Sequence, residues 1–402
     1  MLNKLAKVFL GILTQGIASI ATMVLSIIVA RSVPQADFGI FAITISTWIV
    51  VVGSIRASTA EVFLFDHSVG ERHQVSIRIS QSASAGLMLS LIAALGLVAL
   101  GFIVPSAANA FGILAVGIPA LFLQDANRFY LISEGRQLVA LAVDVTYVIS
   151  IVLTMVFLFT PGSLSGFLWL WVACSWVAGV SGVVLARYGI SLRGATDWFS
   201  GQSRTIVHFF GDFVVANGVA NAAVYFVAAW GSLADAAAIR GSQVLLVPIL
   251  LVMRGASVAL GGELARLASV GKRRRVLQAV GVLSLVQVVA VGAAGLVVSV
   301  VPNDIVRTLL GESSDVTLRV FPFAAAATLA LGLATVAMIG LKAAGDVRQS
   351  LSLKLITAPL TLGMMTVGVF TDGAAGSQVG LAAGESLRTA LQWRRLLIWQ
   401  KN

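Results

Sequence analysis

The chain consists of apolar runs long enough to cross a membrane, separated by short polar turns. A spanning helix needs about 20 mostly apolar residues, and in the hydrocarbon core a helix satisfies its own backbone hydrogen bonds. Hydrophobic residues make up 58% of the 402 residues and charged residues 11%, against about 25% in a typical soluble domain. The pattern therefore predicts an all-α polytopic membrane protein with about twelve transmembrane helices.

The last two predicted helices are the shortest, and they contain Lys354, Glu385 and Arg388. The full set of predicted spans is 8–30, 38–55, 81–103, 111–132, 138–160, 166–186, 209–230, 237–258, 277–300, 317–340, 351–370 and 375–392.

Basic residues are distributed unevenly between the loops that these spans define. With the N-terminus inside, the outer side receives few of the 27 Lys and Arg residues, namely Arg31, Arg240, Arg307 and Arg319. Because cytoplasmic loops carry an excess of Lys and Arg, this distribution predicts that both termini are cytoplasmic. The run GKRRR at 271–275 is then expected to face anionic lipid headgroups, and the net charge of +10 does not indicate a nucleic-acid partner.

The two halves of the chain resemble each other weakly. YLISEGRQLVAL at 130–141 has a counterpart in GLKAAGDVRQSL at 340–351, with Gly135 matching Gly345. Because six helices separate the copies, both halves have the same orientation, as in transporters built from parallel repeats. We therefore predict an N-terminal six-helix bundle at 1–186, a cytoplasmic linker at 187–208 and a C-terminal six-helix bundle at 209–402.

Charged residues at membrane depth need a partner or a water-filled cavity, because each costs roughly 2.5 to 3.5 kcal/mol on insertion scales. Asp125, Arg128 and Asp144 lie at similar depth on either side of the turn near Gly135. They are expected to form an acid–base–acid cluster that either fixes the packing of two helices or serves transport. In transport, Arg128 would face an anionic substrate, or Asp125 or Asp144 would carry a coupling ion. The second half has no equivalent of this cluster at matching positions.

Polar residues also recur on the seventh and eighth predicted spans. Asp212, Asn217 and Asn221 lie on the seventh, where they either bond to other helices or line a cavity, and Asp212 is a further candidate for ion coupling. Arg240 and Gln243 are three residues apart on the eighth, and Arg240 is the strongest single candidate for binding phosphate.

Some residue types exclude other sites. Cys174 is the only cysteine, so the chain has no internal disulfide, and no ATP-binding GxxxxGK[ST] loop is present. No cofactor or metal is expected. Tryptophans near predicted helix ends are expected to lie at the headgroup level, namely Trp169, Trp198, Trp230, Trp393 and Trp399. Glu385 and Arg388, three residues apart, are expected to form a local ion pair.

Several of these stretches together resemble the MOP superfamily, specifically its polysaccharide-transporter and O-antigen flippase branch. The resemblance is carried by VARSVPQADFGIFAI, LFLQDANRFYLISEGRQLVALAVDV, DAAAIRGSQVLLVPILLVMRG and LKAAGDVRQSLSLKL, in that order along the chain. It implies two six-helix bundles around a central cavity, similar to multidrug and toxin extrusion (MATE) transporters and the lipid II flippase. It places Asp125, Arg128 and Asp144 in one family signature and Arg240 in another, without assigning them roles.

The resemblance implies a flippase of the bacterial cytoplasmic membrane that translocates polyprenyl-diphosphate-linked oligosaccharide by alternating access. The expected partners are the lipid-linked glycan, membrane lipids, and a polysaccharide polymerase with other proteins of the same biosynthesis. The alternative is a cation-coupled exporter of drugs or metabolites of the MATE type. An enzyme is not expected, because no long extramembrane segment with acidic catalytic residues is present.

Overall fold

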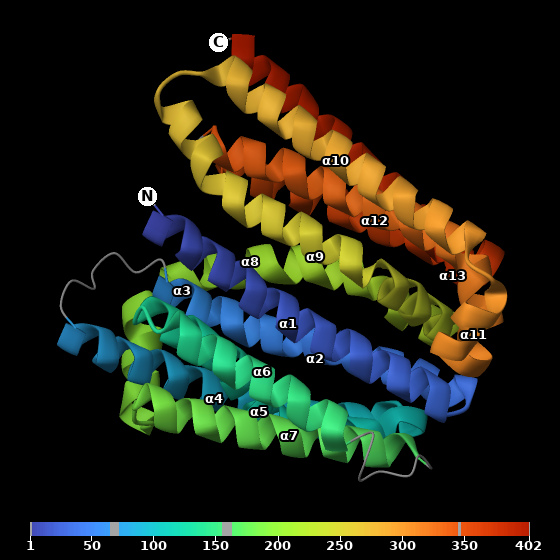
Figure 1. Ribbon diagram of the computed structural model, residues 1–402, viewed down its shortest axis with the longest axis horizontal. Helices are drawn as coiled ribbons and strands as arrows, with labels where there is room; N and C mark the ends of the chain where they lie inside the picture. Colours follow the sequence, from blue (N-terminus) through green and yellow to red (C-terminus); the bar gives the residue numbers. More distant parts are fainter. Residues whose placement is uncertain (1, 65–71, 155–162, 345–346, 402) are drawn as a thin grey trace. The chain divides into compact units, whose positions relative to one another are not determined.

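A computed structural model of the chain describes residues 2–64, 72–154, 163–344 and 347–401, for some of which it describes the backbone alone. Residues 155–160 of the fifth predicted span, and Gly345 of the repeat, lie outside the described residues. All regular structure in the described part is helical (Figure 1). The helices are α1 (Leu2–Ser32), α2 (Gln35–Ser58), α3 (Ala60–Leu64), α4 (Arg72–Ile103), η1 (Pro105–Ala107), α5 (Ala108–Ser133), α6 (Gln137–Leu153), α7 (Leu164–Ala186), α8 (Leu192–Trp230), α9 (Leu233–Ser269), α10 (Arg273–Val300), α11 (Asn303–Leu310), η3 (Gly311–Ser313), α12 (Ser314–Ala343) and α13 (Val347–Lys401).

The described helices include nine stretches that are long and apolar enough to cross a membrane. The last of these, Ser352–Gln400, is interrupted at Asp372 and Gly373 and so contains two of the predicted spans. Two further apolar helices, Ser19–Ser32 and Gln137–Leu153, are shorter and fall on the first and fifth predicted spans. Each predicted span is helical over its described residues, so the prediction of an all-α, multi-pass membrane protein is confirmed.

The chain divides into two compact units. The first contains Met1–Val33 and Ile43–Gly218, and the second contains Pro34–Ala42 and Val219–Asn402. Helix α2 therefore begins in the second unit and continues in the first, whereas α8 begins in the first and ends in the second. The segment 187–208, predicted as a linker, belongs to the first unit and is helical from Leu192 onward.

Trp198 shows how this segment is attached to the first unit. Its side chain is fully buried, and its indole N–H donates to the carbonyl of Ser58 at the end of α2 (3.1 Å). The expectation that Trp198 lies at the headgroup level is therefore wrong, because α8 extends past the predicted span and packs its first turns into the protein. Trp169 and Trp230, by contrast, are about half exposed.

Helices α4 to α7 form the body of the first unit, in which α5 packs against α4, α6 and α7 (Figure 1). Asn127 of α5 joins α5 to α7, because its side-chain amide donates to the carbonyl of Gly179 (2.9 Å). A Cβ atom at Gly182 would lie 2.2 Å from the amide nitrogen of Asn127, so only glycine allows this approach.

In the second unit, α12 packs against α9, α10 and α13. Helix α13 folds back on itself at Asp372 and Gly373, where Gly373 has a φ of 51° that favours glycine. The two arms approach closely: a Cβ atom at Gly376 would lie 2.1 Å from the carbonyl oxygen of Gly368. Gly376, Gly380 and Gly384 recur every four residues, which is the small-residue spacing that lets membrane helices pack backbone to backbone.

We expect Gly376→Ala to destabilise the protein by about 1–3 kcal/mol, because the added methyl group meets a backbone carbonyl that cannot rotate away. The midpoint of thermal unfolding in detergent measures this effect. Gly363→Ala is the matched control on the same helix, since a Cβ atom there meets nothing within 4 Å. Equal midpoints for the two variants would contradict the close packing of the two arms.

Candidate functional site

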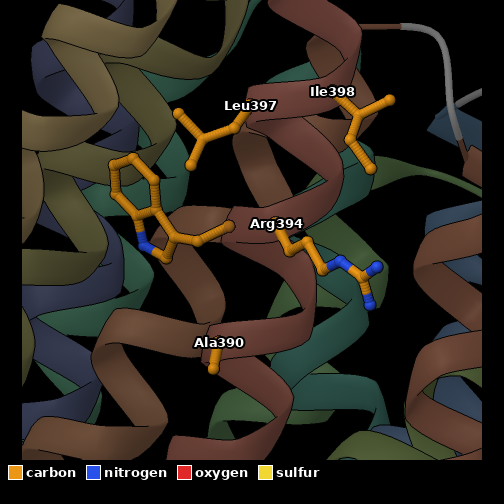
Figure 2. A pocket seen from close by; sticks show the side chains of 5 residues that line it. Ala390, Arg394, Leu397 and Ile398 are labelled. Carbon is orange, nitrogen blue, oxygen red and sulfur yellow. The ribbon is translucent and has the colours of Figure 1, made fainter.

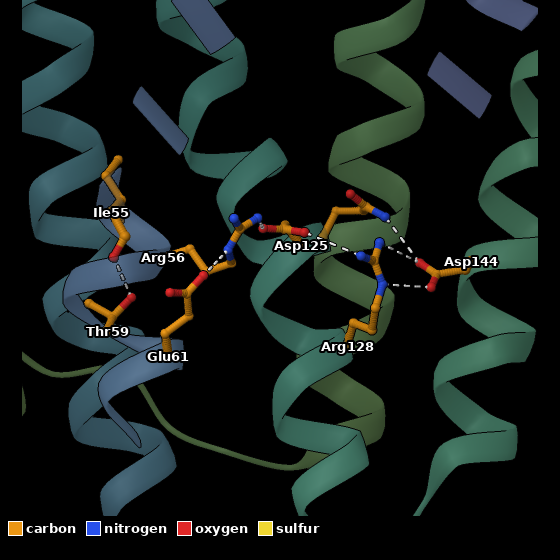
Figure 3. A network of polar contacts seen from close by, with 8 residues as sticks. Ile55, Arg56, Thr59, Glu61, Asp125, Arg128 and Asp144 are labelled. Carbon is orange, nitrogen blue, oxygen red and sulfur yellow. Dashed lines mark hydrogen bonds and ion pairs between the residues drawn. The ribbon is translucent and has the colours of Figure 1, made fainter. Parts of the chain in front are cut away.

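A buried ion pair between α5 and α6 is the centre of the candidate site in the first unit (Figure 3). Arg128 Nε donates to Asp144 Oδ2 (2.8 Å), and Arg128 Nη2 donates to Asp144 Oδ1 (3.3 Å). Gln124, one helical turn before Arg128, donates to the same carboxylate (3.2 Å). Arg128 is 5% and Asp144 1% exposed, so both charges depend on each other for solvation.

Asp125 extends the pair into a longer network. Its Oδ1 accepts from Arg128 Nη1 (3.4 Å) and its Oδ2 from Arg56 Nη1 (2.8 Å), while Arg56 Nε donates to Glu61 Oε1 (2.8 Å). The order Glu61, Arg56, Asp125, Arg128, Asp144 alternates acid and base. It connects α3, α2, α5 and α6, and the structure thus brings Asp125, Arg128 and Asp144 together as predicted.

Arg56 and Glu61 were not identified from the sequence as members of this network. Arg56 lies in the last turn of α2, a position typical of a basic residue at the cytoplasmic surface. Instead its guanidinium lies over the rings of Phe129 (5.7 Å) and Phe213 (5.8 Å) and bonds to carboxylates on two helices. Its proximity to Glu61, five residues on, was the sequence signal that could have indicated a buried pair.

The network is well suited to fixing the packing of helices. Each of the three guanidinium nitrogens of Arg128 donates to a carboxylate within the network. Contact between Arg128 and a substrate would require these bonds to open. The network contains three acids and two arginines, so the full complement of charges is net negative by one.

A set of polar contacts at the turn between α7 and α8 joins that turn to α5 and α4. Tyr188 donates its hydroxyl to Asn127 Oδ1 (2.5 Å), and burial raises the pKa of Tyr188, so that it remains a donor at neutral pH. The ring of Tyr188 also contacts that of Tyr130 edge to face (5.5 Å). Tyr130 in turn bonds to Ser82 of α4 (2.9 Å).

Among the predicted residues of α8, Asp212 directly precedes Phe213, the residue that contacts Arg56, and Asn217 and Asn221 lie one and about two turns beyond it. Asp212 and Asn217 are half-buried, and Asn217 donates to the carbonyl of Phe213 in its own helix (3.2 Å). Asn221 is buried. Asn217 and Asn221 fall on either side of the division between the two units, on one continuous helix.

In the second unit, Arg240 is buried on α9 and its Nη1 donates to Gln243 Oε1 (3.4 Å), so these two predicted residues are in contact. The neighbouring turn packs tightly on α12, because a Cβ atom at Gly241 would lie 2.2 Å from Thr317 Oγ1. Arg240 is thus held at a helix–helix contact.

The second unit also has a buried charged group of its own on the two arms of α13. Glu385 and Arg388 form the predicted ion pair, and Lys354 from the first arm acts electrostatically on Glu385. All three side chains are less than a tenth exposed. This group is no equivalent of the Asp125, Arg128 and Asp144 cluster, because Glu385 and Arg388 lie on the second arm of α13, beyond the repeated stretch. Among the described residues there is no group of three acidic, histidine or cysteine side chains that could hold a metal ion.

Comparisons with known proteins define the fold. No protein-family model and no curated protein sequence matches this chain. An inward-facing multidrug resistance MATE family transporter of the MOP superfamily matches with a TM-score of 0.70 and 14% identity over 96% of both chains. The lipid II flippase MurJ in an inward closed conformation matches with a TM-score of 0.66 and 13% identity, over 98% of this chain and 88% of that one. A MOP superfamily transporter from Pyrococcus furiosus, described as having a binding pocket of reverse polarity, matches at 0.62 and 15% over 98% and 94%.

The chain therefore has the fold that MATE transporters share with MurJ. At these identities the similarity shows the fold alone and leaves the substrate to be argued from residues.

We expect Asp144→Ala to destabilise the protein by about 3–5 kcal/mol, because it leaves the charge of Arg128 buried without its main partner. The double variant Arg128→Met and Asp144→Ala is expected to recover much of this loss. Unfolding in detergent measures both effects. The exposed pair Arg307 and Asp315 (3.4 Å) is the matched control, where alanine is expected to cost less than about 1 kcal/mol.

A double variant no more stable than Asp144→Ala would show that an unpaired Arg128 is not the cause of the loss.

Proposed function

We propose that this protein is a membrane flippase that translocates a polyprenyl-diphosphate-linked oligosaccharide across the bacterial cytoplasmic membrane by alternating access. The observation that carries the proposal is the charge of the second unit's interior. Among its described side chains, the buried charged residues are the cations Arg240, Lys354 and Arg388 and the anion Glu385. An interior with an excess of cations is suited to an anionic substrate.

A diphosphate requires such cations when it leaves water. Moving the diphosphate through the membrane removes the water that surrounds it, and positively charged hydrogen-bond donors replace part of the hydrogen bonds lost with that water. Arg240 is the strongest candidate to contact the diphosphate, because a guanidinium can donate two parallel bonds to one phosphate. Asn217, Asn221 and Gln243 are candidates to bind sugar hydroxyls, for which amide side chains are suitable partners.

The fold supports transport, and the sequence resemblance supports this particular substrate class. Both the MATE transporters and MurJ share the fold, so the fold itself does not choose between their substrates. The proposal places both termini in the cytoplasm, following the distribution of basic residues along the chain. It also makes a polysaccharide polymerase and other proteins of the same biosynthesis the expected partners.

A second candidate is a cation-coupled exporter, and one observation favours it. The network of the first unit contains three acids against two arginines. A carboxylate in excess of its cationic partners is suited to binding a coupling proton or cation, and the candidates are Asp125 and Asp144 of the network and Asp212 of α8. Such a protein would transport cationic substrates, so the choice of substrate in a transport assay separates the two proposals.

In proteoliposomes, we expect the protein to accelerate the flipping of labelled polyprenyl-diphosphate oligosaccharide relative to empty liposomes. Arg240→Gln is expected to reduce the flipping rate at least about tenfold, because it removes the charge that binds phosphate. Arg240→Lys is expected to retain part of the rate. Arg319→Gln, an exposed cation on α12, is the matched control and is expected to flip at the parent rate.

No acceleration over empty liposomes would overturn the flippase proposal. A normal rate for Arg240→Gln would remove Arg240 from the site. Uptake of a cationic dye in place of the glycan lipid would favour the exporter.

A further inference from the structure

The end of the second unit that carries the GKRRR run has a basic pocket of about 550 Å³, which is shallow and open to its surroundings. It lies where the turn between α9 and α10 meets the C-terminal end of α13. Its lining consists of Lys272, Arg273, Arg274, Arg275, Gln278 and Gln400. The sequence predicts general attraction of this run to headgroups, and the structure adds that the basic side chains surround one shallow pocket.

Local structure fixes the turn. Gly271, with a φ of 72°, lets α9 end in a tight turn in which Lys272 N–H donates to the carbonyl of Leu267 (3.0 Å). Arg273 then joins the turn to α13: its Nη1 donates to the carbonyl of Trp399 (3.0 Å), and its guanidinium lies over the Trp399 ring (5.2 Å). The basic side chains thus extend from a fixed backbone.

Three cations remain available at this turn. Lys272, Arg274 and Arg275 are exposed, and the described carboxylates form no ion pair with them. They surround the N-terminus of α10, whose dipole adds positive potential. A candidate span begins at Arg273, so these groups stand at one end of an apolar helix that is long enough to cross a membrane.

A second surface begins beside this pocket. A groove of about 390 Å³ on α13 is lined by Ala390, Trp393, Arg394, Leu397 and Ile398 (Figure 2). Trp393, Leu397 and Gln400 are spaced by four and three residues, so they share one helical face. The groove and the basic pocket are thus lined from the same face of the last turns of α13, with Gln400 of the pocket one turn beyond Leu397 of the groove. Leu397 is 49% and Ile398 40% exposed, which leaves apolar surface for an acyl chain to cover.

We infer that this end of the second unit is a binding site for an anionic phospholipid, with its headgroup phosphate in the basic pocket and one acyl chain along the groove of α13. The cations select a net negative headgroup, because a zwitterionic lipid places its own cation against them. The groove selects a lipid over a free anion. The inference depends on these two surfaces and not on the transported substrate.

Native mass spectrometry of the full chain in detergent tests the inference with phosphatidylglycerol and phosphatidylcholine of identical acyl chains. We expect phosphatidylglycerol to be retained preferentially. The triple variant Lys272→Gln, Arg274→Gln and Arg275→Gln is expected to weaken its retention at least about tenfold, since each basic residue near a membrane surface contributes to anionic-lipid binding. The matched control neutralises the exposed Arg187, Arg193 and Arg204 of the first unit and is expected to bind like the parent.

Two further measurements separate the headgroup from the chain. Leu397→Ser is expected to weaken retention of phosphatidylglycerol severalfold, and inorganic phosphate is expected not to displace the lipid. The charge-conserving variant Lys272→Arg, Arg274→Lys and Arg275→Lys, expected to retain the lipid, shows that loss in the first variant is not a folding defect.

The inference is overturned if the neutralised variant binds like the parent, if the control loses as much, or if phosphatidylcholine binds equally well. Displacement of the lipid by inorganic phosphate would also overturn it, as a free-anion site. None of these results depends on glycan flipping, so failure of this inference and failure of the proposed function are distinguishable.

Discussion

A charge at membrane depth must be neutralised by the protein itself, and the pair between Arg128 and Asp144 is where the first unit meets this constraint. The pair is bidentate and buried, and it joins α5 to α6. Asp125 also pairs with Arg56 of α2, and Arg56 pairs with Glu61 of α3, so the ion pairs connect all four helices. Shifting one of these helices alone would separate opposite charges in a medium that solvates neither. The network thus holds α2, α3, α5 and α6 together through side chains alone.

The second unit meets the same constraint with a different construction. Apart from Arg240 on α9, its buried charges described by the structure lie on the two arms of α13, and glycines bring those arms close enough for backbone to meet backbone. Glycines have no side chains that interlock, so their contacts alone do little to fix how the two arms of α13 align along each other. The ion pair between Glu385 and Arg388, with Lys354 opposite, supplies a specific set of partners. The same residues give the interior its excess of cations, so packing and the proposed substrate preference depend on shared side chains.

Residues near helix ends show why the sequence predicted the candidate site only in part. The sequence allowed Asp125, Arg128 and Asp144 to be grouped, because a short turn separates their two helices. All three are a similar number of residues from that turn, and the fixed rise per residue of a helix then places them at a similar depth. Arg56 could not be added, since its partner Asp125 lies 69 residues away and end-of-helix arginines usually face the cytoplasm. The burial of Trp198 was missed for a related reason. Helix α8 begins at Leu192, well before the apolar stretch that starts at 209, and its first turns pack into the protein. Lys354 reads as a cation of a cytoplasmic helix end, yet the fold of α13 buries it.

The sequence by itself determined the class of the protein, its helices and the place where α13 breaks, because apolar length and turn residues act locally along the chain. Tertiary structure alone decided that Arg56 and Glu61 join the buried network, that residues 187–208 belong to the first unit, and that the GKRRR turn lies against the end of α13. These are contacts between segments far apart in sequence. Their geometry depends on how closely the helices approach each other, and single glycines such as Gly182 and Gly376 decide this distance. The residue pattern along one helix does not show which other helix packs against it.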